Sequence, residues 1–159
     1  MLHASKLWSL DLHGPASDDA VLATAVASAS LEIPELHGSA LRGPGLAGLA
    51  RLPKLRVLRL NLIEVDALSL QIQSLRTLSL RAHASNDREV AALLAKVPAE
   101  LENLHLRGTA VSDAVLDALA PFHKLRYLDV VDTGVTTEGM QRFTAARPSL
   151  RFHPRPRKA

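Results

Sequence analysis

Two histidines carry the clearest metal-ligand pattern in the sequence. His13 follows Asp11 by two residues, and His37 follows Glu35 in the same way. Imidazole nitrogens and carboxylates bind zinc and related ions, so these four side chains would form a His-His-carboxylate site if the fold brought them together. A solvated polar surface explains the same residues. We therefore expect neither a bound metal nor a cofactor, and we keep a metal-binding or enzymatic role of the His13/His37 cluster as a third alternative.

The residue types give little support for nucleophilic catalysis. The sequence has no cysteine, which excludes thiolate chemistry and disulfides. Ser39 is the serine nearest in sequence to His37, but closeness in sequence is poor evidence for a catalytic triad. Gly43-Pro-Gly-Leu-Ala-Gly48 has the G-x-G-x-x-G spacing without directly following a strand, as a dinucleotide site requires. We predict that the protein is not an enzyme and has no catalytic residues.

Basic residues gather at the C-terminal end. The 159 residues carry a formal charge of +3 with a pI near 9.7, yet the chain before Gly139 has 13 positive residues against 16 acids. Residues 153–159 contain two prolines and no apolar period, which indicates a basic, flexible tail. Such a tail binds phosphate weakly and in a salt-sensitive way. Polyanion or nucleic-acid binding through this tail and the arginines described below is therefore the second alternative.

The elements that would position these side chains come from an internal repeat. Leucines open successive segments, spaced by 20 to 26 residues, at Leu7, Leu31, Leu55, Leu75, Leu101, Leu125 and Leu150. Most segments begin L-x-x-L-x-L, whose fourth and sixth positions share one face of a strand. Val115, Leu116, Leu119 and Phe122 then follow helical spacing. Each copy thus predicts a strand, a turn and a helix.

The clearest copies are LENLHLRGTAVSDAVLDALAPFHK (101–124) and LRYLDVVDTGVTTEGMQRFTAARPS (125–149). They resemble the leucine-rich repeat (LRR) family, in particular its bacterial and F-box-associated variants with repeats of about 24 residues. The resemblance implies an α/β solenoid in a right-handed arc. Its parallel β-sheet would line the concave side, with helices and one extended segment on the convex side. We expect an N-terminal extension (1–6), a repeat domain (7–152) and the tail.

Local signals refine this picture. Asn86 and Glu89 have the spacing of a capping box, and Ser112 with Asp113 favours a helix start. Pro34 stands at a core leucine position and predicts a distorted strand. Residues 67–74 alternate apolar and polar side chains, which predicts the extended convex segment.

The third, fifth and seventh positions of each copy should project from the concave face, where a partner would bind. They place basic side chains near the middle and acids toward both ends. Like charges in neighbouring strands repel unless an anion lies between them. We therefore predict a non-catalytic scaffold or adaptor that binds another protein through an acidic segment, with Ile33 and Tyr127 as apolar anchors. The predicted contact residues are Ile33, Arg59, Arg81, His105, Arg107, Tyr127 and Asp129.

The sequence also bears on location and assembly. No secretion signal or membrane-length apolar stretch occurs, and cysteine is absent, which favours a cytoplasmic protein, and the repeat variant favours a bacterial one. The first copy starts close to Met1, so the core edge near Trp8 is thinly covered. This predicts end-on self-association or a cap supplied by a partner.

Overall fold

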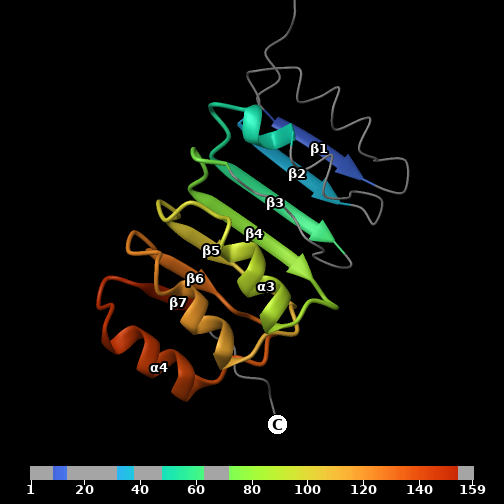
Figure 1. The fold of residues 1–159 in the computed structure, drawn as a ribbon. Helices are drawn as coiled ribbons and strands as arrows, with labels where there is room; N and C mark the ends of the chain where they lie inside the picture. The colour runs from blue at the N-terminus through green and yellow to red at the C-terminus, as the bar shows by residue number, and fades with distance from the viewer. Residues whose placement is uncertain (1–8, 14–31, 38–47, 63–71, 154–159) are drawn as a thin grey trace, which may run out of the picture.

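Seven parallel strands form one sheet, and their order in the sheet is their order in the chain. The computed structural model describes residues 9–13, 32–37, 48–62 and 72–153, and of the first two strands it describes the backbone. The strands are β1 (Ser9–His13), β2 (Ile33–His37), β3 (Val57–Leu62), β4 (Thr77–Ala82), β5 (Asn103–His105), β6 (Tyr127–Asp129) and β7 (Arg151–His153). Each strand pairs with the strand of the next copy, so the copies stack as the leucine spacing predicts (Figure 1).

The leucines of the repeat form the core beneath the sheet. Leu58, Leu78, Leu104 and Leu128 lie in register across β3 to β6 and are each 0% exposed. The copy-opening leucines that the structure describes are buried with them, namely Leu55, Leu75, Leu101, Leu125 and Leu150. More exposed residues alternate with the core leucines along these strands, so they project from the opposite face of the sheet. This alternation of buried and more exposed residues is present in β3 to β5, whereas in β6 Asp129, at a predicted solvent-facing position, is buried.

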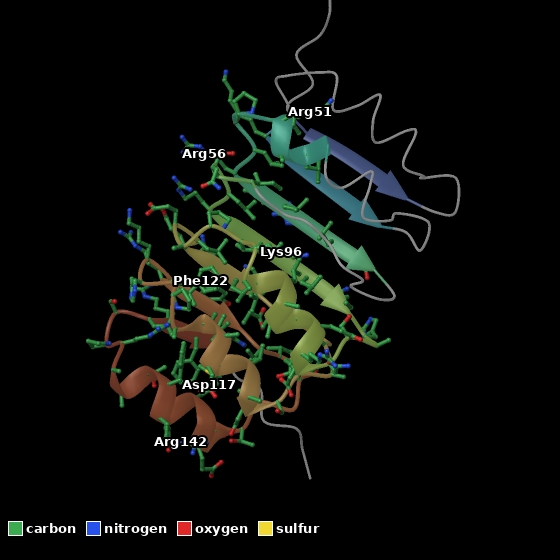
Figure 2. The ribbon with its side chains drawn as sticks, viewed as in Figure 1. Arg51, Arg56, Lys96, Asp117, Phe122 and Arg142 are labelled. Atoms are coloured by element: carbon green, nitrogen blue, oxygen red, sulfur yellow. The ribbon has the colours of Figure 1, made fainter. Side chains whose placement is uncertain are left out.

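Short helices cover the core side of the sheet (Figure 1). They are the 3-10 helices η1 (Gly48–Arg51) and η2 (Asp113–Leu119) and the α-helices α3 (Asp87–Leu94) and α4 (Thr137–Ala145). In Figure 1, η2 lies between α3 and α4, and it contacts both. Phe122, labelled in Figure 2, follows η2 and belongs to the leucine core. The predicted strand-turn-helix unit is therefore present in these copies, although η2 is a 3-10 helix.

The predicted helix caps are confirmed. The side chain of Asn86 accepts hydrogen bonds from the N–H groups of Arg88 and Glu89, and Glu89 accepts one from the Asn86 N–H at 3.1 Å. Ser112 caps η2 by accepting from the Ala114 N–H at 3.3 Å. Each cap satisfies backbone donors that the first turn of a helix leaves unpaired.

The first residue of α3 and the first residue of η2 each accept hydrogen bonds from the N-cap residue of the helix in the next copy. Asp87 accepts from the N–H and hydroxyl of Ser112 at 2.8 and 2.7 Å. Asp113 accepts from the same two groups of Thr136, both at 2.7 Å. The Thr136 N–H bond, together with its hydroxyl and the nearby Arg142, outweighs desolvation and holds the pKa of Asp113 below its ordinary value. Polar bonds thus join the helical layer from copy to copy at its surface.

Gly139 leaves room for the Asp113 carboxylate where it bonds to Thr136. It is the third residue of α4, and its N–H donates to the hydroxyl of Thr136 at 3.0 Å. A Cβ atom at this position would lie 2.2 Å from Oδ1 of Asp113. The close approach of the carboxylate therefore requires glycine here, despite the low helix propensity of glycine.

The turns after β5 and β6 share one conformation. Gly108 (φ 70°) and Asp132 (φ 58°) both adopt left-handed backbone angles, which glycine and aspartate tolerate best. The next residues, Thr109 and Thr133, are buried, and their hydroxyls donate to the carbonyls three residues earlier at 2.8 and 2.6 Å. The buried hydroxyls are satisfied, so they add polar atoms to the core without a desolvation penalty for an unpaired group.

The atypical copies are described in part. β2 pairs with β1 over five residues, but its register with β3 covers only Glu35 to His37, directly after Pro34. Most of the predicted extended segment 67–74 lies outside the described residues, as does Trp8 at the edge proposed for self-association. At the other end, Leu128 pairs with Phe152, whereas a copy opening at Leu150 would place His153 opposite it, so β7 is offset by one residue from the leucine spacing.

Candidate functional site

Strand pairing brings the predicted columns together on the sheet face opposite the helices, which we call the open face. The fifth column consists, in register, of Glu35, Arg59, Ser79, His105 and Asp129. In the seventh column, Asn61 pairs with Arg81. Neighbouring strands in a sheet lie about 4.8 Å apart. Residues separated by twenty or more positions in sequence therefore become neighbours on this face.

A hollow of about 400 Å³ lies on the open face between β3 and β6. It is lined by Arg59, Leu60, Asn61, Thr77, Ser79, Arg81, His105, Arg107, Tyr127 and Asp129. Six of the seven predicted contact residues are in this set. The seventh, Ile33, lies in β2, where the structure describes the backbone alone. The structure therefore assembles the predicted residues of β3 to β6 around one space.

Asp129 is the one carboxylate among the residues that line this hollow. It is 3% exposed, and its Oδ2 accepts a hydrogen bond from Nη2 of Arg107 at 2.9 Å. Its Oδ1 accepts from the N–H of Val131 at 3.0 Å, and Nδ1 of His105 lies 3.5 Å from Oδ2. Desolvation raises the pKa of Asp129, but the Val131 bond, Arg107 and His105 together lower it below the ordinary value of 3.8. Asp129 is thus a buried carboxylate that remains ionised at neutral pH.

Two rings form one wall of the hollow. The rings of His105 and Tyr127 have centroids 5.2 Å apart at an interplanar angle of 45°. Both residues are half-buried and stand on neighbouring strands, β5 and β6. The amide of Asn103 donates to the hydroxyl of Thr77 at 3.1 Å beside them. This side of the hollow offers aromatic surface as well as polar groups.

The remaining side of the hollow is basic. Arg59 and Arg81 are exposed, and Arg107 has a side-chain exposure of 47% despite its bond to Asp129. Among the described residues, Arg81 makes no ion pair. The hollow therefore holds three arginines against one aspartate. Its surplus of positive charge favours an anionic ligand.

The metal hypothesis concerns residues that are described only by their backbone. Register pairs His13 with His37 and Asp11 with Glu35, as the sequence spacing requires. Their side chains are outside what the structure describes. Within the described part of the chain, no group of three or more metal-ligand side chains comes together. A metal-binding role of the His13/His37 cluster therefore stays an alternative that the described residues do not test.

Sequence reasoning missed several polar residues of the site and of the fold. Asn61, Thr77 and Ser79 line the hollow, although the set of predicted contact residues omits them. Their positions in the third, fifth and seventh columns are the signal that identifies them. The link between Asp87 and Ser112 was also missed, because it joins neighbouring copies and needs three-dimensional geometry.

Two further predictions concern the basic C-terminal tail and a membrane span. Residues 154–159, which include most of the predicted basic tail, lie outside the described residues. None of the helices in the described ranges is long and apolar enough to span a bilayer.

Comparison with known proteins identifies the fold. No family model and no curated protein matches the sequence. An LRR protein of Leptospira interrogans matches in structure with a TM-score of 0.60 and 17% identity. An internalin of Listeria monocytogenes matches with a TM-score of 0.54 and 15% identity. The chain has the leucine-rich-repeat fold.

The LRR fold extends over nearly the whole chain. The two matches cover 91% and 96% of it. The matched part of this LRR chain spans 37% of the Leptospira protein and 48% of the internalin, less than half of each. At this level of identity the likeness establishes the architecture, and the ligand has to be argued from the open face itself.

Proposed function

We propose that the protein is a non-catalytic interaction module that binds another protein on the open, concave face of its sheet. The observation that carries this proposal is the hollow between β3 and β6, whose lining includes three arginines and one buried aspartate. Proteins with this fold generally use their curved faces to bind other macromolecules. The absence of cysteine supports a cytoplasmic location for the module.

The chemistry of Asp129 argues for binding rather than catalysis. Both of its oxygens accept hydrogen bonds, and its pKa is lowered. A carboxylate with these properties is a weak general base at neutral pH. The rings of His105 and Tyr127 beside it offer contact surface of the kind that anchors protein interfaces.

The charge of the hollow suggests an acidic segment in the partner. Complementary charge raises the association rate and excludes basic competitors. Tyr127, and Ile33 where β2 extends the face, remain the proposed apolar anchors. Such anchors would keep the complex together when salt screens the charges.

The test compares affinity purification from the native cell with tagged wild-type protein and two charge-matched variants. Arg59→Ser/Arg81→Ser removes two arginines from the hollow and retains Arg107, because removing Arg107 would leave Asp129 without its cation. Arg56→Ser/Arg126→Ser removes the same charge outside the hollow. Arg56 directly precedes β3, at the side of the sheet where the strands begin (Figure 2).

The hollow variant should lose a specific partner that the wild type and the control variant both retain. Equal capture by all three proteins would contradict the proposal.

A salt series distinguishes the polyanion alternative. A protein complex with apolar anchors should persist at a salt concentration that removes phosphate contacts. Capture that disappears with salt, and also after nuclease treatment, would favour nucleic acid instead.

A further inference from the structure

Arg81 and Arg107 stand at equivalent positions of neighbouring copies, Arg81 within β4 and Arg107 two residues after the end of β5. Ser79 of β4 pairs with His105 of β5, and each arginine follows two residues later. After β5 the backbone bonds toward the next copy, since the Leu106 and Gly108 N–H groups donate to the Asp129 and Val131 carbonyls at 2.8 and 3.0 Å. Both arginines line the same hollow. Two guanidinium groups so placed repel one another unless an anion lies between them.

The two arginines differ in how they are held. Arg107 is oriented by its 2.9 Å bond to the buried Asp129, which engages one Nη atom and leaves other donors of a half-exposed side chain. Arg81 is exposed and, in the described part of the chain, has no ion pair. The pair thus combines a fixed donor group with an adjustable one.

The size of the hollow argues against a single small ion as its whole occupant. Its volume of about 400 Å³ is many times the roughly 10–15 Å³ that a cavity needs, on the same measure, to hold one water molecule. The ring pair of His105 and Tyr127 supplies aromatic surface in the same space. An occupant that matches the hollow therefore needs an anionic group together with apolar atoms.

We propose that Arg81 and Arg107 bind one carboxylate side chain of a partner protein segment, while the His105–Tyr127 ring pair packs against an apolar side chain of the same segment. This inference rests on the proposed function, since it assigns part of the open face to one element of the partner. Asp129 acts as a positioning residue that holds Arg107. Its negative charge offsets part of the arginine charge and favours a monoanionic carboxylate over a dianionic phosphate.

The test uses a peptide of defined sequence, acetyl-Leu-Glu-Leu-Ser-Leu-amide, and its counterpart with glutamine in place of glutamate. Each peptide is titrated into the full chain labelled with ¹⁵N, and the Nε–Hε signals of the arginines are followed by NMR. Because charge-assisted hydrogen bonds are the stronger kind, the glutamate peptide should bind on the order of tenfold more tightly than the glutamine peptide. The largest signal shifts should be those of Arg81 and Arg107.

A double-mutant cycle decides whether the contact is direct. Arg81→Gln should remove the preference for glutamate while leaving the affinity for the glutamine peptide unchanged. Arg126→Gln, an exposed arginine outside the hollow, should keep the preference. Asp129→Asn removes the negative charge beside Arg107 and should weaken the discrimination against inorganic phosphate, a readout that a change in stability alone would not move. An unchanged glutamate preference in Arg81→Gln would overturn the inference.

Two further outcomes separate this subsite from the broader proposal. If inorganic phosphate displaces the glutamate peptide at concentrations where acetate does not, the site is a phosphate site and the carboxylate assignment is wrong. If the Arg59→Ser/Arg81→Ser variant loses its cellular partner, but wild type binds both peptides equally, the subsite fails while the proposed function stands. If capture of the partner is also unaffected, both fail.

Discussion

Replacing Arg107 with glutamine should destabilise the protein more than the exposure of this side chain suggests. The arginine itself is about half exposed, with a side-chain exposure of 47%, but its partner Asp129 is 3% exposed. The substitution removes the 2.9 Å bond and leaves a buried carboxylate with the Val131 N–H and His105 as its neighbours. The cost therefore comes from the buried charge that remains and not from the surface group that is lost.

The magnitude follows from the burial of the two partners. Removing one partner of a buried ion pair costs about 3–5 kcal/mol, because the other charge is left uncompensated. Water already reaches Arg107, and the Val131 bond persists, so we expect a smaller loss of about 2 kcal/mol. For a chain of this size, this corresponds to a decrease in Tm of about 4–8 °C.

Urea unfolding followed by far-UV circular dichroism measures this loss at neutral pH. Arg126→Gln is the matched control, since it removes the same charge at an exposed position, and should stay within about 0.5 kcal/mol of wild type. Combining Arg107→Gln with Asp129→Asn should cost less than the sum of the two single substitutions, because no buried charge is left unpaired. A change below about 0.5 kcal/mol for Arg107→Gln, or strict additivity in the double variant, would refute the reasoning.

Arg107→Gln should also change the pH dependence of the free energy of unfolding. In wild type the folded pKa of Asp129 is below its ordinary value of 3.8, so its stabilising contribution is present above that pH and is lost as pH falls through the folded pKa. Without Arg107, desolvation has less opposition, so the folded pKa of Asp129 should rise. The difference in unfolding free energy between wild type and variant should therefore be largest near neutral pH and shrink in acid. A constant difference from neutral pH into the acid range would contradict this assignment.

Three further predictions concern the helical layer, and each is checked by urea unfolding. Gly139→Ala should lower stability by about 1–3 kcal/mol, because its Cβ would meet the Asp113 carboxylate, and the loss should largely disappear in an Asp113→Ala background. Asp87→Ala should cost about 1 kcal/mol through two lost hydrogen bonds, whereas Asp117→Ala at an exposed position of η2 should cost less than about 0.5 kcal/mol. Asn86→Ala removes the capping box and should cost about 1 kcal/mol. Equal losses for the two aspartates would contradict the proposed link between copies.

The fold was predictable because one signal repeats along the chain. The spacing of the leucines determines which residues lie in register, and the register then places Arg59 beside Ser79, and His105 beside Asp129, without any knowledge of side-chain geometry. Caps such as Asn86 with Glu89 were predictable for a related reason, since both partners lie within one turn. Period and local spacing are the kinds of information that a single sequence carries directly.

The features of the site that sequence analysis missed depend on the orientation and the burial of side chains. Sequence placed Asp129 in a solvent-facing column, yet it is buried and bonded to Arg107 and Val131. Its neighbour at position 131 is a valine where the preceding copy has Arg107, so the column itself changes from charged to buried at this copy. A column predicts which residues are neighbours, but the packing of the last copies decides which of them water reaches.

Net charge is a poor guide to what the open face binds, because several acids of the described region are paired with bases. Asp113 pairs with Arg142, and Asp129 pairs with Arg107. Glu100 and Glu102 pair with Lys124 and Arg76 outside the hollow. Opposite charges that pair locally cancel at distances beyond a Debye length of about 8 Å, whereas a surplus on one face does not. The lining of the hollow, with three arginines and one aspartate, therefore keeps a surplus of positive charge although the chain before Gly139 has more acids than bases.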